Sequence, residues 1–288
     1  MSKEKYPLRR KIYGGTMQAL MYFSVFVTCA LVLAIIGYVL IKGLPNITWK
    51  LLSTKPSYLS NSIGILPDIL NTIYIIIVCL VVVLPLGVGA AIYLTEYAEN
   101  KKLVGVIEYA AETLSGIPSV VYGLVGMLIL VPAIRKLFHV PDGASLLAAI
   151  IVLSVMVLPS IINVSMTSLE AVPKEYEEGS LALGATQIET YMRVSVPAAK
   201  SGIATAIVLG VGRALGEAMA VMMVSGNAAN MPSLFQSVRF LTTAVASEMA
   251  YSSGLHRQAL FSIALVLFLF IMLINAGLNL ILKHKKEG

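Results

Sequence analysis

The stretch DILNTIYIIIVCLVVVLPLGVGAAIYL, residues 68–94, decides the class of fold. It is almost wholly apolar, and only Asp68 at its start carries a charge. An apolar helix needs about 20 residues to cross the hydrocarbon core of a bilayer. This stretch exceeds that length, so we expect it to be a membrane-spanning helix.

The composition of the whole chain agrees with this expectation. Of its 288 residues, 58% are hydrophobic and 12% are charged, and the mean hydropathy is +0.86. Soluble domains carry about 45–50% apolar and roughly 25% charged residues. The composition therefore argues against a soluble globular enzyme and against a disordered chain, and it favours a polytopic membrane protein.

Six apolar segments are expected to span the membrane, which makes the predicted fold class all-α with six transmembrane helices. They run near residues 17–41, 68–94, 109–134, 145–168, 202–224 and 258–282. The expected organisation is an N-terminal segment 1–16, a first helix with its external loop 17–67, a main domain 68–282 containing a cytoplasmic loop 169–201, and a basic tail 283–288.

Lysine and arginine set the predicted orientation, because they concentrate on the cytoplasmic side of membrane proteins. The side that holds both termini and the loops 95–108 and 169–201 carries 13 basic residues, and the opposite side carries 7. Both termini are therefore expected in the cytoplasm. Basic residues at membrane edges also explain the net charge of +6, so no nucleic-acid partner is expected.

Several kinds of chemistry lack their motif in this chain. Cys29 and Cys79 lie inside apolar runs, and the three histidines are scattered, so no metal site is expected. There is no G-x-x-x-x-G-K-[ST], H-E-x-x-H or G-x-S-x-G sequence. We therefore expect no catalytic residue and no cofactor bound by this chain.

The most informative predicted cytoplasmic segment is EAVPKEYEEGSLALGATQIETYMRVSVPAAKSGI, which begins at Glu170. Pro173 suits the start of a helix, and the acidic residues that follow suit its first turn. Gly184 then ends this helix, and a second short helix runs to Pro197. The pattern predicts a helix–glycine–helix hairpin at the membrane surface. Composition alone would favour a plain amphipathic linker.

The spacing within this hairpin resembles the EAA loop of permeases in ABC importers. The matching positions are Glu178, Gly179, Ser180, Gly184 and Pro197, the last preceded by Val194-Ser195-Val196. Gly179 and Ser180 stand where the family has two alanines. The resemblance implies the type I importer permease fold over 68–282. It also implies that the hairpin is a coupling helix that docks on a separate ATPase homodimer, where ATP and Mg²⁺ would bind.

The predicted fifth span, GVGRALGEAMAVMMVSGN over 210–227, contains an intramembrane charge pair. Arg213 and Glu217 are four residues apart, so a continuous helix would place them on one face. Charges at mid-bilayer normally face protein or water and mark ion pathways. The pair could instead simply neutralise itself as a packing contact. Gly212 and Gly216 form a small-xxx-small pattern that suits close helix packing.

Together with SGIPSVVYGLVG (115–126), this stretch resembles permeases of phosphate importers, more the PstC-type subunit than its PstA-type partner. The resemblance covers roughly residues 65–280. It implies that Arg213 and Glu217 line the substrate pathway. It also implies three kinds of partner: a second homologous permease, the ATPase homodimer and an extracytoplasmic phosphate-binding protein.

A helix break near the pathway is expected at Gly116, Pro118 and Ser119, because proline removes a backbone donor and frees a carbonyl. Such broken backbone either lines a cavity or is a kink satisfied by neighbouring helices. Three alternative functions stay open. They are an ABC importer of the same type for molybdate or sulfate, a secondary transporter that needs no ATPase, and a membrane scaffold or sensor.

Overall fold

The computed structural model describes residues 8–56, 64–98 and 100–284. The far ends of the predicted N-terminal segment and basic tail, residues 1–7 and 285–288, lie outside the described residues. Within the described ranges the chain is helical and has no β-strand, which confirms the all-α prediction. Among the described residues, five helices are long and apolar enough to cross a membrane. A sixth span results if α11 (Lys200–Gly216) is counted with the helical segment before it, from which it is bent by 64°.

The remaining elements follow the chain in this order: α1 (Leu8–Gly43), a 3₁₀ turn (Leu44–Asn46), α2 (Trp49–Ser53), α3 (Leu66–Ile92), a π-helical turn (Tyr93–Tyr97), α4 (Lys101–Gly116), α5 (Ser119–Val125), a π-helical turn (Gly126–Leu130), α6 (Val131–Phe138), α7 (Leu146–Glu170), α8 (Lys174–Ala182), α9 (Gln187–Thr190), a π-helical turn (Tyr191–Ser195), α10 (Val196–Ala198), α12 (Met219–Ser225), α13 (Leu241–Glu248) and α14 (Gly254–His284).

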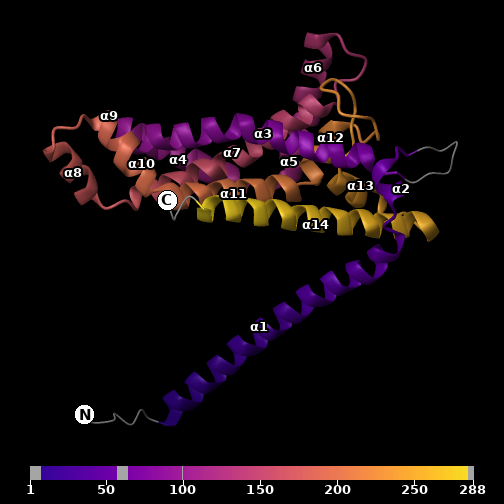
Figure 1. The fold of residues 1–288 in the computed structure, drawn as a ribbon, viewed down its shortest axis with the longest axis horizontal. Coiled ribbons are helices and arrows are strands. Elements are labelled where there is room, and N and C mark those ends of the chain that lie inside the picture. Colours follow the sequence, from indigo (N-terminus) through magenta and orange to yellow (C-terminus); the bar gives the residue numbers. More distant parts are fainter. Residues whose placement is uncertain (1–7, 57–63, 99, 285–288) are drawn as a thin grey trace.

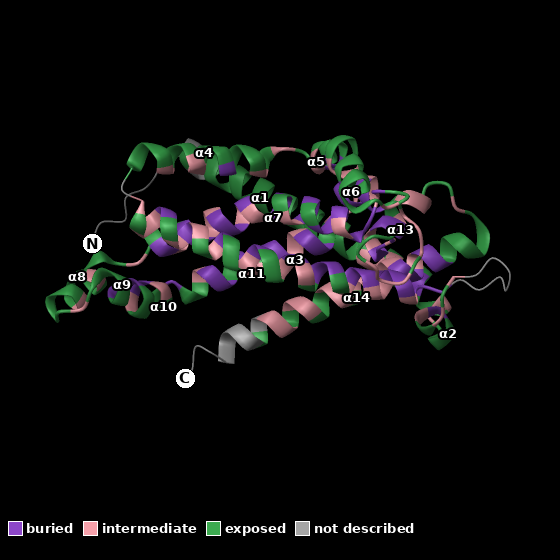
Figure 2. Ribbon diagram, turned by 90° about the horizontal axis from the view of Figure 1, so that it is seen from above, coloured by how far each residue is buried: buried purple, intermediate pink, exposed green. Residues whose placement is uncertain are grey.

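Helix α7 is the centre of the bundle. It packs along α3 on one side and α11 on another, and half of its most apolar window is buried (Figure 2). Glycines allow these close contacts. A β-carbon on Gly87 of α3 or on Gly210 of α11 would lie 2.8 Å from the side chain of Ile161, which is fully buried in α7. The three helices therefore form the core on which the other elements are placed.

Helix α1 diverges from the rest of the bundle (Figure 1). None of its apolar window is buried within the chain, so its side chains are available to lipid or to another subunit. Its C-terminal end is fixed to α14, where the Ser262 hydroxyl donates to the Gly43 carbonyl oxygen at 2.7 Å. The predicted first span is confirmed, and the helix starts earlier than expected, at Leu8.

Two predicted spans differ from the structure because each contains a break. Residues 109–116 of the third predicted span belong to α4, and the apolar helix that could cross the membrane is Ser119–Phe138. Ile117 and Pro118 between them are extended, since proline disfavours the helical conformation in the residue before it. The fifth predicted span, 202–224, is interrupted after Gly216, where Glu217 is extended.

Candidate functional site

The site is organised around Arg213, in the last turn of α11. Its guanidinium donates through Nη1 to the Ser160 hydroxyl of α7 at 2.6 Å. It also donates through Nη2 to the carbonyl oxygen of Ser115, at the end of α4, at 3.3 Å. Three helices therefore meet at one half-buried cation.

The helix break of α4 supplies part of this site. Because α4 ends at Gly116, the carbonyls of its last turn lack partners in the next turn of helix. The Leu114 carbonyl accepts from the Tyr122 hydroxyl at 2.8 Å, and the Ser115 carbonyl accepts from Arg213. Gly116, Pro118 and Ser119 thus form the break itself. The atom next to it that contacts the cation is a backbone oxygen.

Both partners of Arg213 are uncharged. Among the described residues, the ion pairs involve Arg239 and His256 with carboxylates, and none of them includes Arg213. A charge within a membrane-spanning helix is costly unless it faces protein, water or a counter-ion. The neutral contacts position the guanidinium but leave its positive charge uncompensated, which suits interaction with an anion.

The expectation that Arg213 and Glu217 share a helical face is wrong. Glu217 lies one residue beyond the end of α11, in extended backbone with φ −74° and ψ 126°. Its Oε1 instead accepts from the Ala220 backbone N–H of α12 at 2.8 Å. The carboxylate satisfies a free donor at the start of the next helix, which explains why the chain can break here.

The predicted close contact at Gly212 and Gly216 is also absent within the described part of the chain. A β-carbon built on either glycine meets nothing within 4 Å. Gly210, two residues earlier, is the position where α11 approaches α7 closely. The face of α11 that carries Gly212 and Gly216 is therefore left open next to Arg213.

The hairpin between α7 and α11 has the predicted form. Gly184 follows α8 with φ +87°, a backbone conformation that L-residues other than glycine rarely adopt. The Ser195 hydroxyl donates to Oε1 of Glu177 at 2.8 Å, and the Thr190 hydroxyl donates to that of Ser180 at 2.9 Å. These two bonds tie α8 to the second half of the hairpin, so the tip is held as a unit.

The hairpin lies at one end of the bundle (Figures 1 and 2). Glu178, Gly179, Gly184 and Pro197 are all exposed. Leu183, beside the left-handed glycine, is 92% exposed. Large apolar side chains at a polar tip are typical of a surface that another protein covers.

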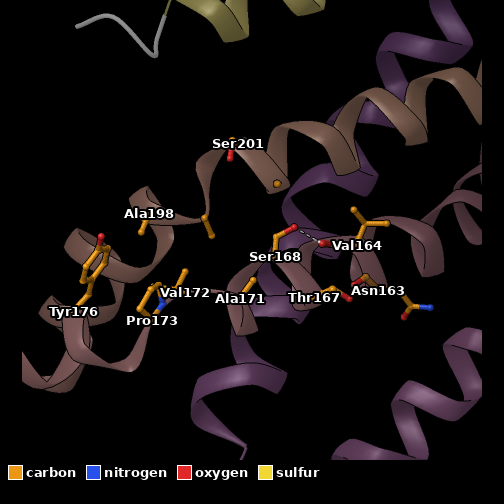
Figure 3. A pocket seen from close by; sticks show the side chains of 12 residues that line it. Asn163, Val164, Thr167, Ser168, Ala171, Val172, Pro173, Tyr176, Ala198 and Ser201 are labelled. Carbon is orange, nitrogen blue, oxygen red and sulfur yellow. Dashed lines mark hydrogen bonds between the residues drawn. The ribbon is translucent and has the colours of Figure 1, made fainter. Parts of the chain in front are cut away.

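A cavity of about 620 Å³ lies where the hairpin joins the spans (Figure 3). Its walls come from the end of α7, the start of α8 and the region where α10 meets α11. Its lining residues are uncharged: Asn163, Val164, Thr167, Ser168, Ala171, Val172, Pro173, Tyr176, Ala198, Ala199, Ser201 and Gly202.

A second charged cluster lies at the opposite end of the bundle. Arg239 donates to both carboxylate oxygens of Asp68, with the shortest contact at 2.9 Å, and to Oε1 of Glu248, also at 2.9 Å. Asp68 is fully buried at the start of α3. Burial opposes the charge on Arg239, but the hydrogen bonds and charge of Asp68 outweigh it, so the pKa of Arg239 lies above its usual value.

Sequence reasoning missed Ser160 and the Asp68–Arg239 pair. A serine in an apolar helix has no local signal that marks it as the partner of an arginine 53 residues away. Asp68 did carry a signal, because a carboxylate at the start of an apolar run requires a partner. Among the described residues, no group of three or more His, Cys, Asp or Glu side chains could hold a metal ion.

The sequence of the chain matches a known protein family and several known relatives. Residues 83–286 match the family model described as binding-protein-dependent transport system inner membrane component. The chain is 42% identical over 244 residues to the probable ABC transporter permease protein YqgH of Bacillus subtilis, covering 82% of this chain and 76% of that protein. It is 35% identical over 251 residues to the phosphate transport system permease protein PstC of Pasteurella multocida, covering 79% and 78%.

Solved structures show the same fold at low sequence identity. A bacterial ABC transporter involved in the import of the acidic polysaccharide alginate matches with a TM-score of 0.66 at 15% identity, over 96% of this chain and 99% of that one. The MetNI methionine ABC transporter matches with a TM-score of 0.58 at 20% identity, over 77% and 94%. The predicted permease fold is therefore confirmed.

Proposed function

The chain belongs to the family of binding-protein-dependent transport system inner membrane components, the permeases of ABC importers, and on that premise we propose that it forms part of the membrane pathway of a phosphate importer. It is a multi-pass membrane protein and a transporter subunit, not the ATPase. Its similarity to PstC permeases supports phosphate as the cargo.

The observation that carries this proposal is the uncompensated cation in α11. Arg213 is fixed by the Ser160 hydroxyl and the Ser115 carbonyl, and neither of them neutralises it. A guanidinium presents a planar set of donors that matches the oxygens of phosphate. In this proposal Arg213 is the anion contact of the pathway.

Glu217 is the second pathway residue of the proposal. It sits four positions after Arg213, and its carboxylate caps the start of α12. In the proposal, this carboxylate lowers the net positive charge of the 213–217 segment and so limits how tightly the pathway holds an anion. Release is then possible when the pathway opens to the other side.

The hairpin from α8 to α10 is the proposed contact with the ATPase. Its exposed Glu178–Gly184 tip would dock in a groove of an ATPase homodimer, which binds ATP and Mg²⁺. Closure of that dimer would move the hairpin and, through α11, the helices around Arg213. The result is alternating access, in which the site faces first one side of the membrane and then the other.

The full assembly would contain a second, homologous permease of PstA type, an ATPase homodimer of PstB type and an extracytoplasmic phosphate-binding protein of PstS type. The proposed orientation puts both termini and the hairpin in the cytoplasm. The Asp68–Arg239 end then faces the binding protein. The open glycine face of α11 and the exposed α1 are surfaces on which the second permease and lipid can pack.

Uptake of radiolabelled phosphate at low micromolar concentration tests this function, in cells with and without the chain, with sulfate and molybdate measured alongside. Loss of phosphate uptake alone is the expected result. Loss of sulfate or molybdate uptake instead would indicate an ABC importer with a different substrate. Uptake that persists when ATP is depleted would point to a secondary transporter.

A further inference from the structure

We propose that the cavity between α7, α8 and α11 is the cytoplasmic end of the anion route, and that Asn163 is an anion-contacting residue between Arg213 and this exit. The proposal rests on the proposed function, since it assumes that an anion reaches Arg213. The proposal adds a second polar residue to the anion route, one that no sequence motif identifies.

The helical register of α7 connects the cavity to the cation. At 100° per residue, Ser160, Asn163 and Thr167 fall on one face of the helix. Ser160 contacts Arg213, whereas Asn163 and Thr167 line the cavity. The rise from Ser160 to Asn163 is about 4.5 Å, so one helical turn separates the cation from the cavity wall.

Figure 3 shows lining residues in a row that leads from Pro173 and Ala171, which follow α7, to Thr167 and Asn163 within α7. Asn163 lies at the end of this row farthest from α8. The side chain of Ser201, from the start of α11, faces the same space from the opposite wall. The cavity therefore extends from the hairpin toward the part of α7 that holds Ser160.

Only some of the polar groups in this cavity have donors to offer. The hydroxyls of Thr167 and Ser168 donate to the carbonyls of their own helix at 2.9 Å and 2.6 Å. Among the described residues, the amide of Asn163 and the hydroxyls of Ser201 and Tyr176 have no such partner. An amide group supplies two N–H donors, so Asn163 is the strongest neutral anion contact in the wall.

The absence of charge suits an exit. Among the described residues, the cavity is lined by no carboxylate that would repel phosphate and by no lysine or arginine that would retain it. Transport requires that binding be favourable enough for entry and weak enough for release. A neutral amide meets both conditions, one turn beyond the cation that attracts the anion.

The first test compares three variants in the assembled importer. Asn163→Asp keeps the shape but replaces the two donors with an anionic group, so phosphate uptake should fall at least tenfold with ATPase stimulation by the loaded binding protein preserved. Asn163→Gln, which restores the amide, should recover much of the rate. Thr205→Val, which removes a hydroxyl that donates to its own helix outside the cavity lining, should stay within twofold of the unchanged protein.

The second test asks whether the cavity is open to water. With Cys29 and Cys79 replaced by serine, Asn163→Cys should react with a membrane-impermeant thiol reagent in inverted vesicles, and inorganic phosphate should slow the reaction. No labelling, together with loss of assembly in Asn163→Asp, would overturn the proposal and assign the cavity to a neighbouring subunit. Normal uptake by Asn163→Asp would also overturn it, while the Arg213 function would stand.

Discussion

Replacing Arg239 by methionine should destabilise the protein strongly, because the side chain of Arg239 is only 15% exposed and its main partner is buried. The substitution leaves the Asp68 carboxylate, which is fully buried, without the cation that gives it three N–H···O contacts of 2.9–3.2 Å. Breaking a buried ion pair by removing one partner costs about 3–5 kcal/mol. Asp68 can lower that cost by taking up a proton, so we expect about 3 kcal/mol.

Replacing Asp68 should lower the stability of the fold less than replacing Arg239, because Arg239 has a second partner. In Asp68→Asn, Arg239 keeps its contact with Glu248 at 2.9 Å and remains partly exposed to water. We expect about 1.5–2 kcal/mol there, in the lower part of the range for the loss of hydrogen bonds to a charged group. Glu248→Gln is the control, because this side chain is 32% exposed and such pairs contribute about 0–1 kcal/mol.

The assay is thermal unfolding of the purified complex in detergent. At about 2–4 °C per kcal/mol for a domain of this size, Arg239→Met should lower the midpoint by roughly 6–12 °C. Combining it with Asp68→Leu should restore part of the loss, because both charges are then removed. Equal midpoints for Arg239→Met and Glu248→Gln would refute the reasoning.

Three further substitutions have outcomes fixed by the structure. Gly184→Val places a β-branched residue in a left-handed backbone conformation with φ +87°, and this strain costs about 1–2 kcal/mol. Stimulation of the ATPase by the loaded binding protein should therefore be lost. Unchanged stimulation would count against the coupling role. Gly210→Ala places a β-carbon 2.8 Å from an isoleucine of α7 and should lower the unfolding midpoint of the purified chain, whereas Gly212→Ala should not. Ser160→Ala removes one of the two contacts of Arg213 and should reduce phosphate uptake about fivefold, at about 1 kcal/mol, with assembly intact.

Much of the fold could be predicted because apolar length and glycine positions are local signals. The spans at α1, α3, α7 and α14 were found from hydropathy, and the hairpin was found from Pro173 and Gly184. The third and fifth spans were misplaced for a shared reason. Each contains a break whose free backbone groups are satisfied by distant or unexpected side chains, such as Tyr122 and Glu217.

The sequence identifies the charged residues of the site, but it does not predict their hydrogen-bond partners. Arg213 stood out because a charge in an apolar run is costly. Its hydrogen bond to Ser160 depends on how α7 and α11 pack against each other around Gly210. The helical periodicity of a single segment does not predict this packing. The i,i+4 rule failed for Glu217 because it assumes a continuous helix.

The central claim is that Arg213 is the anion contact of a phosphate pathway, and phosphate uptake by the Arg213→Gln variant tests it most directly. Arg135→Gln is the matched control, since it removes an exposed arginine of α6, and α6 supplies none of the contacts of Arg213 among the described residues. The account predicts that Arg213→Gln abolishes uptake while the complex still assembles and the control transports normally. Near-normal uptake by Arg213→Gln would contradict it.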